Sequence, residues 1–379
     1  MTYQHALRYI TQPTISSNET IELTSLTKEL STHEASPIAV CFSNDKIGQA
    51  AAALLESILC KSGVRHLRWS DVSTAPTKQR FALDGTPLSP PLLSEIAGNI
   101  QQKERAARAL PSDCLSQNDR CAAVLAEYAK ACGAAVLLLQ SDTNMAHTRQ
   151  FGLLFSQLQA ITVVSQTRQV PASATMSSTR EVISLPCGSA MFRRISDACV
   201  ASGSRLSLTQ GADCHVFEQT IGARTIQYRA LPPCRIFSAS SCATDALFLA
   251  LECVLSLRRM GISISDQAIA QGPAEASLPF CCSVLSIHPL ILADQAQSQQ
   301  ELLHVWEDLS SKLAQLPEPR GLWLDPDLAR DSSAVGIPVQ EIYDAKTPLA
   351  SSQMATSLIV GSPLFIEKVT KPLQKSQKR

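Results

Sequence analysis

The chain has 379 residues, of which 45% are hydrophobic and 17% are charged. It carries 33 basic and 33 acidic residues, so its formal net charge is zero and gives no reason to expect nucleic acid or a membrane surface as a partner. The first residues lack the apolar core of a secretory signal, and no apolar run approaches the ~18 residues of a membrane span. We therefore expect a cytoplasmic protein, and its length predicts two or three domains.

Cysteine is frequent, with 13 residues, and an odd number argues against a closed disulfide framework. Most of these cysteines lie in apolar stretches and are expected to be small buried hydrophobes, namely Cys41, Cys60, Cys121, Cys132, Cys199 and Cys253. The Cys281–Cys282 doublet and the neighbours Cys214 and His215 do not complete a ligand set at recognised spacing. The sequence therefore predicts no metal site.

In chain order, apolar strands alternate with helices over most of the sequence. Strands are predicted at 38–41, 135–139, 161–165 and 181–185. Helices are predicted at 49–61, 118–130, 189–202 and 243–260. Gly63, Gly133 and Gly261 are typical of helix ends, while Asn118 or Asp119 could cap the second helix. This alternation predicts βαβ units around a mainly parallel sheet.

A hairpin is predicted around Gly222, between segments 215–218 and 225–229, and Ser265 begins a short helix. The stretch 271–279 contains Gly272 and two prolines and is our candidate linker. Further strands are predicted at 284–287, 290–292, 321–324, 339–343 and 357–360, with a helix at 298–315 and a loop at 165–179. The predicted boundaries are 1–275 for a larger domain, 276–370 for a smaller domain and 371–379 for a basic, solvated tail.

Four strings of the sequence carry a resemblance to a known family. They are MTYQHALRYI at the start, FALDGTPLS at 81–89, CATDALFLALECVLSLRRMGISIS at 242–265 and SLIVGSPLFIEKV at 357–369. In this order they resemble the first helix, the substrate loop, the long helix closing the ATPase domain and the final strand–turn–strand of bacterial folylpolyglutamate synthase, a Mur-ligase enzyme. The resemblance covers almost the whole chain. It implies an α/β fold with a larger ATPase-type domain and a smaller C-terminal α/β domain.

Enzymes of this family phosphorylate a carboxylate with ATP and let an amine displace the phosphate. Their loop G-T-N-G-K-G-[ST] surrounds phosphates with backbone N–H groups and a lysine. The corresponding segment here is FSNDKIGQAA, at 42–51. Aligned without gaps, Gly48 falls at the lysine position and Ala50 at the magnesium hydroxyl. A shift by two residues restores Lys46 but loses the loop's glycines, and Asp45 would repel a polyphosphate. The residues that we interpret as a vestigial nucleotide loop are Asn44, Asp45, Lys46 and Gly48.

The family's other polar positions are also replaced. Gln140 stands where the resemblance places a magnesium-binding glutamate, and an amide is a poorer ligand than a carboxylate. The histidine and carbamylated lysine strings are not found, and His147 lies in the wrong segment. The nucleotide-contacting positions of the long helix and of the second domain become neutral or small side chains. The degenerate family positions are Gln140, Ala239, Ala243, Cys281, Ala293 and Ala296.

Other catalytic motifs give no competing interpretation. The nucleophile elbow G-x-S-x-G and the dinucleotide motif G-x-G-x-x-G are both absent from the sequence. Cys187 precedes a predicted helix start, where a thiol pKa can be lowered, but no histidine partner is identifiable from the sequence. We interpret Cys187 as a structural residue.

Three hypotheses remain. The first is a pseudoenzyme with no catalytic residues and no ATP or Mg²⁺ cofactor. It would act by binding a folate-like ligand or a partner protein, such as an intact folylpolyglutamate synthase or another folate-pathway protein. The alternative is a divergent active ligase that adds glutamate to tetrahydrofolate or dihydrofolate. It would need ATP, Lys46 at the phosphates, and Asp142 or Asp294 on magnesium. The third is a binding module that retains the folate-side cleft at 70–89.

Overall fold

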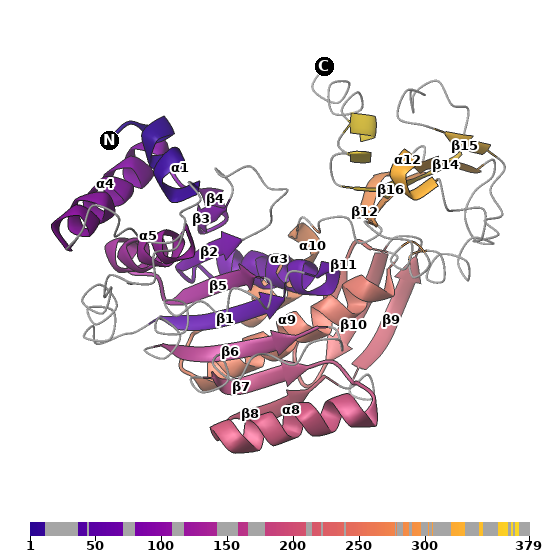
Figure 1. Cartoon of the computed structure of the whole chain (residues 1–379). Helices are drawn as coiled ribbons and strands as arrows, with labels where there is room; N and C mark the ends of the chain where they lie inside the picture. Colours follow the sequence, from indigo (N-terminus) through magenta and orange to yellow (C-terminus); the bar gives the residue numbers. More distant parts are fainter. Residues whose placement is uncertain are drawn as a thin grey trace.

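A computed structural model defines the fold (Figure 1). It describes residues 1–11, 37–43, 45–70, 80–107, 117–141, 158–165, 179–209, 214–220, 223–238, 240–276, 278, 283–287, 290–296, 302, 305, 320–329, 341–343, 355–362, 365–366 and 368–370. The helices are α1 (Tyr3–Thr11), α3 (Lys46–Lys61), α4 (Pro90–Ala107), α5 (Gln117–Cys132), α8 (Ser189–Ser202), α9 (Ser241–Arg259), α10 (Asp266–Glu275) and α12 (Pro326–Ala329). We call the part that ends with α10 the larger domain and the part from β12 onward the smaller domain.

The larger domain is built on one sheet in the order β4-β3-β2-β5-β1-β6-β7-β8. Its strands are β1 (Ile38–Ser43), β2 (His66–Ser70), β3 (Phe81–Leu83), β4 (Thr86–Pro87), β5 (Val136–Ser141), β6 (Gln159–Val164), β7 (Thr179–Ser184) and β8 (Arg205–Leu208). All neighbouring pairs are parallel except those of the β2-β3-β4 edge, where Asp84 and Gly85 form the tight turn with positive φ. A parallel sheet needs cover on both faces, which explains the largely apolar sequences of its central strands β1, β5 and β6.

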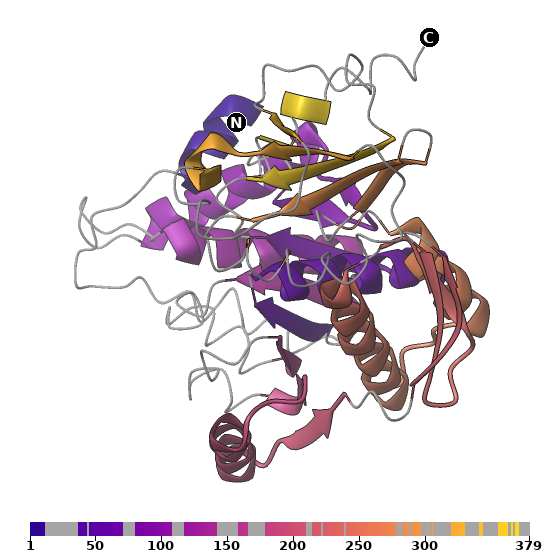
Figure 2. The ribbon, with the colours of Figure 1, turned by 90° about the vertical axis from the view of Figure 1, so that its right-hand side faces the viewer.

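Helices cover both faces of this sheet (Figure 1). Ile38, Val40 and Phe42 of β1 point to the side of α3 and α9, and Ala39 points to the side of α1, α4 and α5. A three-stranded antiparallel sheet, of β9 (Cys214–Thr220), β10 (Ala223–Tyr228) and β11 (Cys234–Ile236), adds its inner face to the α3–α9 core. Figure 2 shows this small sheet beside α9 and α10. The core is therefore continuous from the large sheet to the small one.

The smaller domain contains a second, mostly parallel sheet in the order β12-β13-β16-β14-β15. Its strands are β12 (Ser283–Ile287), β13 (Leu290–Gln295), β14 (Arg320–Leu324), β15 (Glu341–Tyr343) and β16 (Thr356–Gly361). Leu290 and Leu292 face one core cluster, whereas Ile291 and Ala293 face another with Phe365. The domain lies at the upper right of Figure 1 and at the top of Figure 2, on one side of the larger domain.

Most sequence-based predictions of elements are confirmed. All nine predicted strands outside the hairpin overlap observed ones, the hairpin is β9–β10, and α8 has the predicted bounds. Two predictions are wrong. Asn118 and Asp119 do not cap α5, because the helix already begins at Gln117. The first half of the linker 271–279 belongs to α10, which continues to Glu275.

The linker prediction is wrong because its glycine serves close packing. A Cβ added at Gly272 would lie 2.8 Å from the Cα of Ile58, so α10 meets α3 where a side chain has no room. Ser57 of α3 also donates a hydrogen bond of 2.7 Å to the Gly272 carbonyl. The boundary between 275 and 276 coincides with the end of α10 and stays a prediction. The helix predicted at 298–315, apart from Leu302 and Val305, lies outside the described residues, as do residues 166–178 of the loop predicted at 165–179 and the tail 371–379.

The burial of the described cysteines agrees only in part with the prediction. The described cysteines are free thiols, and Cys121, Cys199 and Cys253 are buried as predicted, but Cys60 is exposed near the end of α3.

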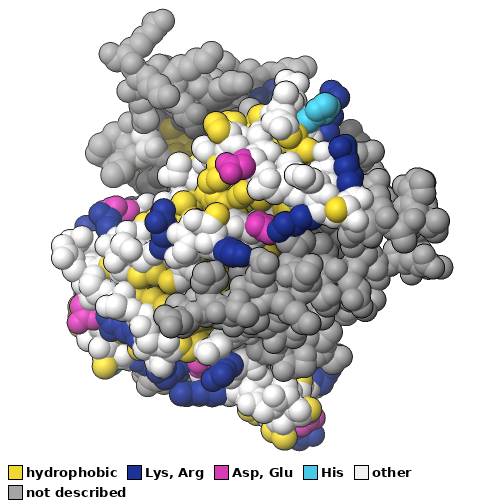
Figure 3. Space-filling view, turned by 90° about the vertical axis from the view of Figure 1, so that its left-hand side faces the viewer, with side chains coloured by type: hydrophobic (Ala, Val, Ile, Leu, Met, Phe, Trp, Pro, Cys, Tyr) yellow, Lys and Arg dark blue, Asp and Glu magenta, His cyan; other side chains and the backbone are white. Residues whose placement is uncertain are grey.

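Among the described residues, no three His, Cys, Asp or Glu side chains gather into a metal-binding group. No described helix has the length and apolarity to cross a membrane. On the described part of the face in Figure 3, Lys and Arg side chains are scattered.

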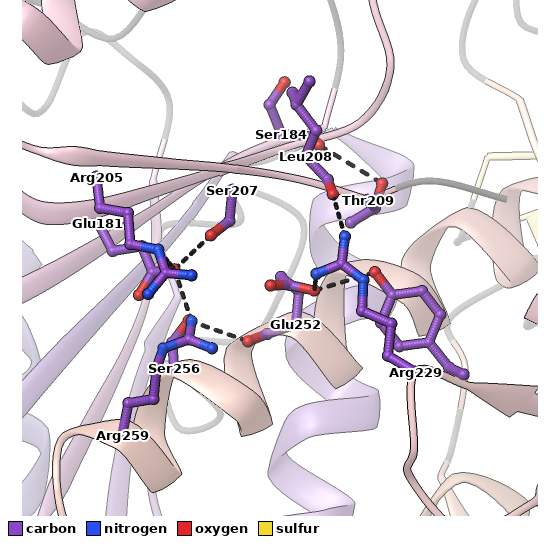
Figure 4. A network of polar contacts seen from close by, with 11 residues as sticks. Glu181, Ser184, Arg205, Ser207, Leu208, Thr209, Arg229, Glu252, Ser256 and Arg259 are labelled. Atoms are coloured by element: carbon purple, nitrogen blue, oxygen red, sulfur yellow. Dashed lines mark hydrogen bonds and ion pairs between the residues drawn. The ribbon is translucent and has the colours of Figure 1, made fainter. Parts of the chain in front are cut away.

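A buried carboxylate joins the large sheet to α9. Glu181 of β7 is 3% exposed, and its Oε1 accepts hydrogen bonds from Ser207 of β8 (2.6 Å) and from Arg259 at the end of α9 (2.7 Å). Arg259 also donates to Ser256 (2.8 Å). Figure 4 shows these residues converging from the sheet and the helix.

A second buried carboxylate joins α9 to the small sheet. Glu252 is 1% exposed, and its Oε2 accepts hydrogen bonds from the Tyr228 hydroxyl (3.0 Å) and from Arg229 (2.8 Å). Arg229 also donates to the Leu208 carbonyl (2.7 Å), so one guanidinium links the small sheet to β8 (Figure 4). Because Arg229 has φ +32°, this connection is made from an unusual backbone conformation. The polar network therefore fixes α9 between the two sheets.

We predict that Glu252→Gln lowers the free energy of unfolding by roughly 3 kcal/mol, since breaking a buried pair leaves polar partners uncompensated. Chemical denaturation monitored by circular dichroism measures this change. Lys103→Gln is the control, because the Lys103–Glu127 pair is exposed on the lysine side and should contribute less than about 1 kcal/mol. An equal effect of the two substitutions would contradict this account.

Candidate functional site

The junction between β1 and α3 is the site where the sequence predicts a vestigial nucleotide loop. β1 ends at Ser43 and α3 begins at Lys46, so two residues make the connection. Asp45 is the N-cap residue, with φ −74° and ψ 168°, and its Oδ1 accepts a hydrogen bond of 2.9 Å from the Gly48 amide. The chain's own carboxylate thus satisfies one of the free N–H groups at the start of α3.

Two hydroxyl groups surround the other oxygen of this carboxylate. Asp45 Oδ2 accepts a hydrogen bond of 2.5 Å from Ser43 Oγ, and Ser165, just beyond β6, donates to the same oxygen. The two serine hydroxyls also contact each other. Asp45 is therefore held by β1, by the segment after β6 and by α3. These residues lie at the carboxyl ends of neighbouring parallel strands, where open α/β sheets bind ligands.

Gly48 is required by the close approach of α3 to β1. A Cβ added at this position would lie 2.2 Å from the Ser43 carbonyl oxygen and 2.7 Å from Ser43 Oγ. Such distances are far below van der Waals contact. The first turn of α3 therefore packs directly on the end of β1, where a phosphate-binding loop would have to curve around its ligand.

Lys46 forms an ion pair with Asp294, near the carboxyl end of β13 in the smaller domain. The lysine side chain is 13% exposed and the aspartate side chain 3%. Lys46 is the first residue of α3, so this contact joins the carboxyl edges of the two parallel sheets. The arrangement brings two carboxylates and one ammonium to the amino end of α3.

Comparisons with known proteins address the whole architecture. No protein-family model and no curated protein sequence matches the chain. Solved structures do match. Folylpolyglutamate synthetase from Lactobacillus casei superposes with a TM-score of 0.74 at 13% identity, covering 100% of each chain. The Thermotoga maritima folylpolyglutamate synthase gives 0.73 at 12% identity, covering 99% of this chain and 97% of that chain.

The chain has the fold of folylpolyglutamate synthase. A bifunctional folylpolyglutamate synthase/dihydrofolate synthase, solved with Mn, AMPPNP and L-glutamate bound, has the same fold, with a TM-score of 0.64 at 17% identity over 99% of this chain and 98% of that chain. The predicted α/β fold class is thereby confirmed over nearly the full length. At these identities, the likeness concerns the fold.

On this folylpolyglutamate synthase fold, the described degenerate positions serve packing. Gln140 is 7% exposed, and its amide lies 3.5 Å from the Gln49 carbonyl of α3. Ala243, in the first turn of α9, is fully buried in the α3–α9 core. Ala293 and Ala296 are also fully buried, and the Ala296 amide donates to the Gly361 carbonyl (3.1 Å). None of these four described side chains is charged.

Four predicted site residues lie outside the described residues, namely Asn44, Asp142, Ala239 and Cys281, and so does His147, which the sequence analysis set aside. Cys187 is partly buried against the cluster under α8, in agreement with a structural role. Sequence reasoning missed Ser43 and Ser165, because serine after a strand is common in loops. It named Asp294 as a metal ligand of the alternative, whereas the structure pairs Asp294 with Lys46.

A thiol–imidazole contact away from the junction was also missed. Cys60 Sγ lies 3.7 Å from Nε2 of the fully buried His66, whose Nδ1 lies 2.8 Å from the Val64 carbonyl. Desolvation, and then the Glu56 and Asp84 carboxylates, raise the pKa of Cys60 to about 11. Because the nucleophile is the thiolate, this pKa opposes a catalytic role at neutral pH.

We predict that Gly48→Ala destabilises the protein by about 2 kcal/mol, because the new methyl group overlaps the Ser43 carbonyl. Urea unfolding measures the effect. Gly188→Ala is the matched control, since Gly188 also joins a strand to a helix but has nothing within 4 Å of an added Cβ. If both variants unfold at the same urea concentration, the close approach of α3 to β1 is not the constraint on residue 48.

Proposed function

We propose that the chain is a folylpolyglutamate synthase-like protein without Mg-ATP-dependent ligase activity, which acts in the cytoplasm by binding a partner protein or a folate-like ligand. The observation that carries this proposal is that the charged side chains at the amino end of α3 are engaged with other groups of the same chain. Asp45 caps the helix and Lys46 pairs with Asp294. A triphosphate needs free amides and a free ammonium at such a place.

Electrostatics supports the proposal quantitatively. A polyphosphate entering this junction would meet the Asp45 carboxylate and would compete with Asp294 for Lys46. Removing one preorganised electrostatic contact typically costs about 3–4 kcal/mol of transition-state stabilisation. The replaced positions include a loop lysine, a metal-binding carboxylate and an ATP-contacting arginine of the resembled family. Their combined loss leaves too little stabilisation for phosphoryl transfer, even though such losses are not additive.

The divergent ligase remains the second candidate, and one finding favours it. The fold is kept over nearly the whole chain, and structures with this fold include complexes with AMPPCP and with Mn, AMPPNP and L-glutamate. Under this hypothesis Lys46 leaves Asp294 and contacts the phosphates, and Asp294 becomes free to hold magnesium. The two hypotheses therefore make opposite predictions about Lys46. In the pseudoenzyme it stays paired with Asp294, whereas in the ligase it contacts the phosphates.

We predict that isothermal titration calorimetry with Mg-ATP gives no binding tighter than about 1 mM, the range of a weak nonspecific anion contact. An intact folylpolyglutamate synthase in the same buffer is the positive control. Micromolar binding by this chain would contradict the proposal. So would ADP release that depends on glutamate and folate and disappears in Lys46→Ala.

The two modes of binding can be separated directly. We predict saturable binding of a reduced folate without ATP if the ligand cleft is retained, and co-elution with an intact folylpolyglutamate synthase in size-exclusion chromatography if the chain binds that partner. Asp45→Asn is the control variant, since it changes the nucleotide junction and should leave both interactions unaltered. Absence of both interactions would exclude the folate-linked form of the proposal.

A further inference from the structure

The ion pair between Lys46 and Asp294 crosses between the two domains. Among the described helices and strands, the extensive packing contacts all lie within one domain, as between α3 and α9 or between β13 and β16. Lys46 and Asp294 therefore make a contact across a boundary that no extensive packing between the described helices and strands crosses. The residues are 248 positions apart in sequence.

Both side chains of this ion pair are largely buried. Asp294 points to the same face of β13 as Leu290 and Leu292, among the apolar residues of the smaller domain, and is 3% exposed. The lysine side chain is 13% exposed. Taking a charge out of water is unfavourable, and a partner of opposite charge in the low-dielectric interior offsets that cost. Separating the two domains would break this contact between opposite charges, so the ion pair opposes separation.

The Lys46–Asp294 ion pair also affects anion binding at the amino end of α3. Lys46 is the first residue of α3, and the carboxylate of the preceding Asp45 already accepts the Gly48 amide. An anion arriving at this helix end would need the Lys46 ammonium, and that group is engaged with Asp294. Domain closure and anion binding therefore compete for one cation.

We propose that the Lys46–Asp294 ion pair is an interdomain latch, which holds the two domains together without a nucleotide and competes with anions for the Lys46 ammonium. The latch stands independently of the proposed function. It would hold a pseudoenzyme closed permanently, and in an active ligase it would be an autoinhibitory contact that the nucleotide must break.

Hydrogen exchange measured by mass spectrometry on the full chain tests the latch. The variants are Lys46→Gln, Asp294→Asn and the double variant, with Lys61→Gln as the matched control. Lys61 lies at the other end of α3 in an exposed pair with Glu275. We expect each single variant to raise exchange about tenfold at the first turn of α3 and at β13, and the double variant to add little, because the two residues act through one interaction. The control should match the wild type.

Two outcomes overturn the proposal. One is exchange at wild-type rates in both single variants. The other is an additive effect in the double variant, which would mean that the two residues act separately. If Lys46→Gln does not fold, Lys46→Arg and Asp294→Asn carry the test. The arginine variant keeps the charge and must remain protected, whereas the asparagine variant must open, and equal exchange in these two variants overturns the latch. Mg-ATP calorimetry is a separate measurement, so failure of the proposed function would be recognised independently.

Discussion

The amino end of α3 is the place on which the organisation of this protein depends. A helix begins there with unsatisfied N–H groups and a partial positive charge, at the carboxyl edge of a parallel sheet. In proteins that bind phosphates, the ligand supplies the compensating negative charge. Here the chain supplies it, with Asp45 on the Gly48 amide and Asp294 on the Lys46 ammonium. A local electrostatic requirement is thus met within the protein, and the Lys46–Asp294 contact also joins its two domains.

Packing around this point is correspondingly tight. Gly48 admits no side chain against β1, and Gly272 admits none against α3. Ala50, Ala51 and Ala52 are fully buried in the core that α3 shares with α9. Small residues let the helix axes approach closely, and the buried Glu181 and Glu252 networks then fix α9 in orientation (Figure 4). The scaffold near the junction is therefore closely packed.

Much of the fold was predictable because its signals are local. Apolar runs such as 38–41 and 135–139 are typical of strands covered on both faces. Gly63, Gly133 and Gly261 take positive φ at the helix ends where they were expected. Elements with weaker patterns, such as α4 and β8, were not predicted. Gly272 and Pro273 resembled a linker, because sequence does not distinguish a glycine that bends the chain from one that lets helices touch.

By itself, the sequence determined the α/β alternation, the full-length resemblance and the absence of a complete phosphate loop, since each is written in neighbouring residues. Only the tertiary structure decided that Ser43 and Ser165 donate hydrogen bonds to Asp45, the residue that caps α3, and that Lys46 meets Asp294. The Ser165–Asp45 and Lys46–Asp294 contacts join residues far apart in the chain. Their existence depends on where two sheets place their carboxyl ends, and that geometry arises from the packing of the whole molecule.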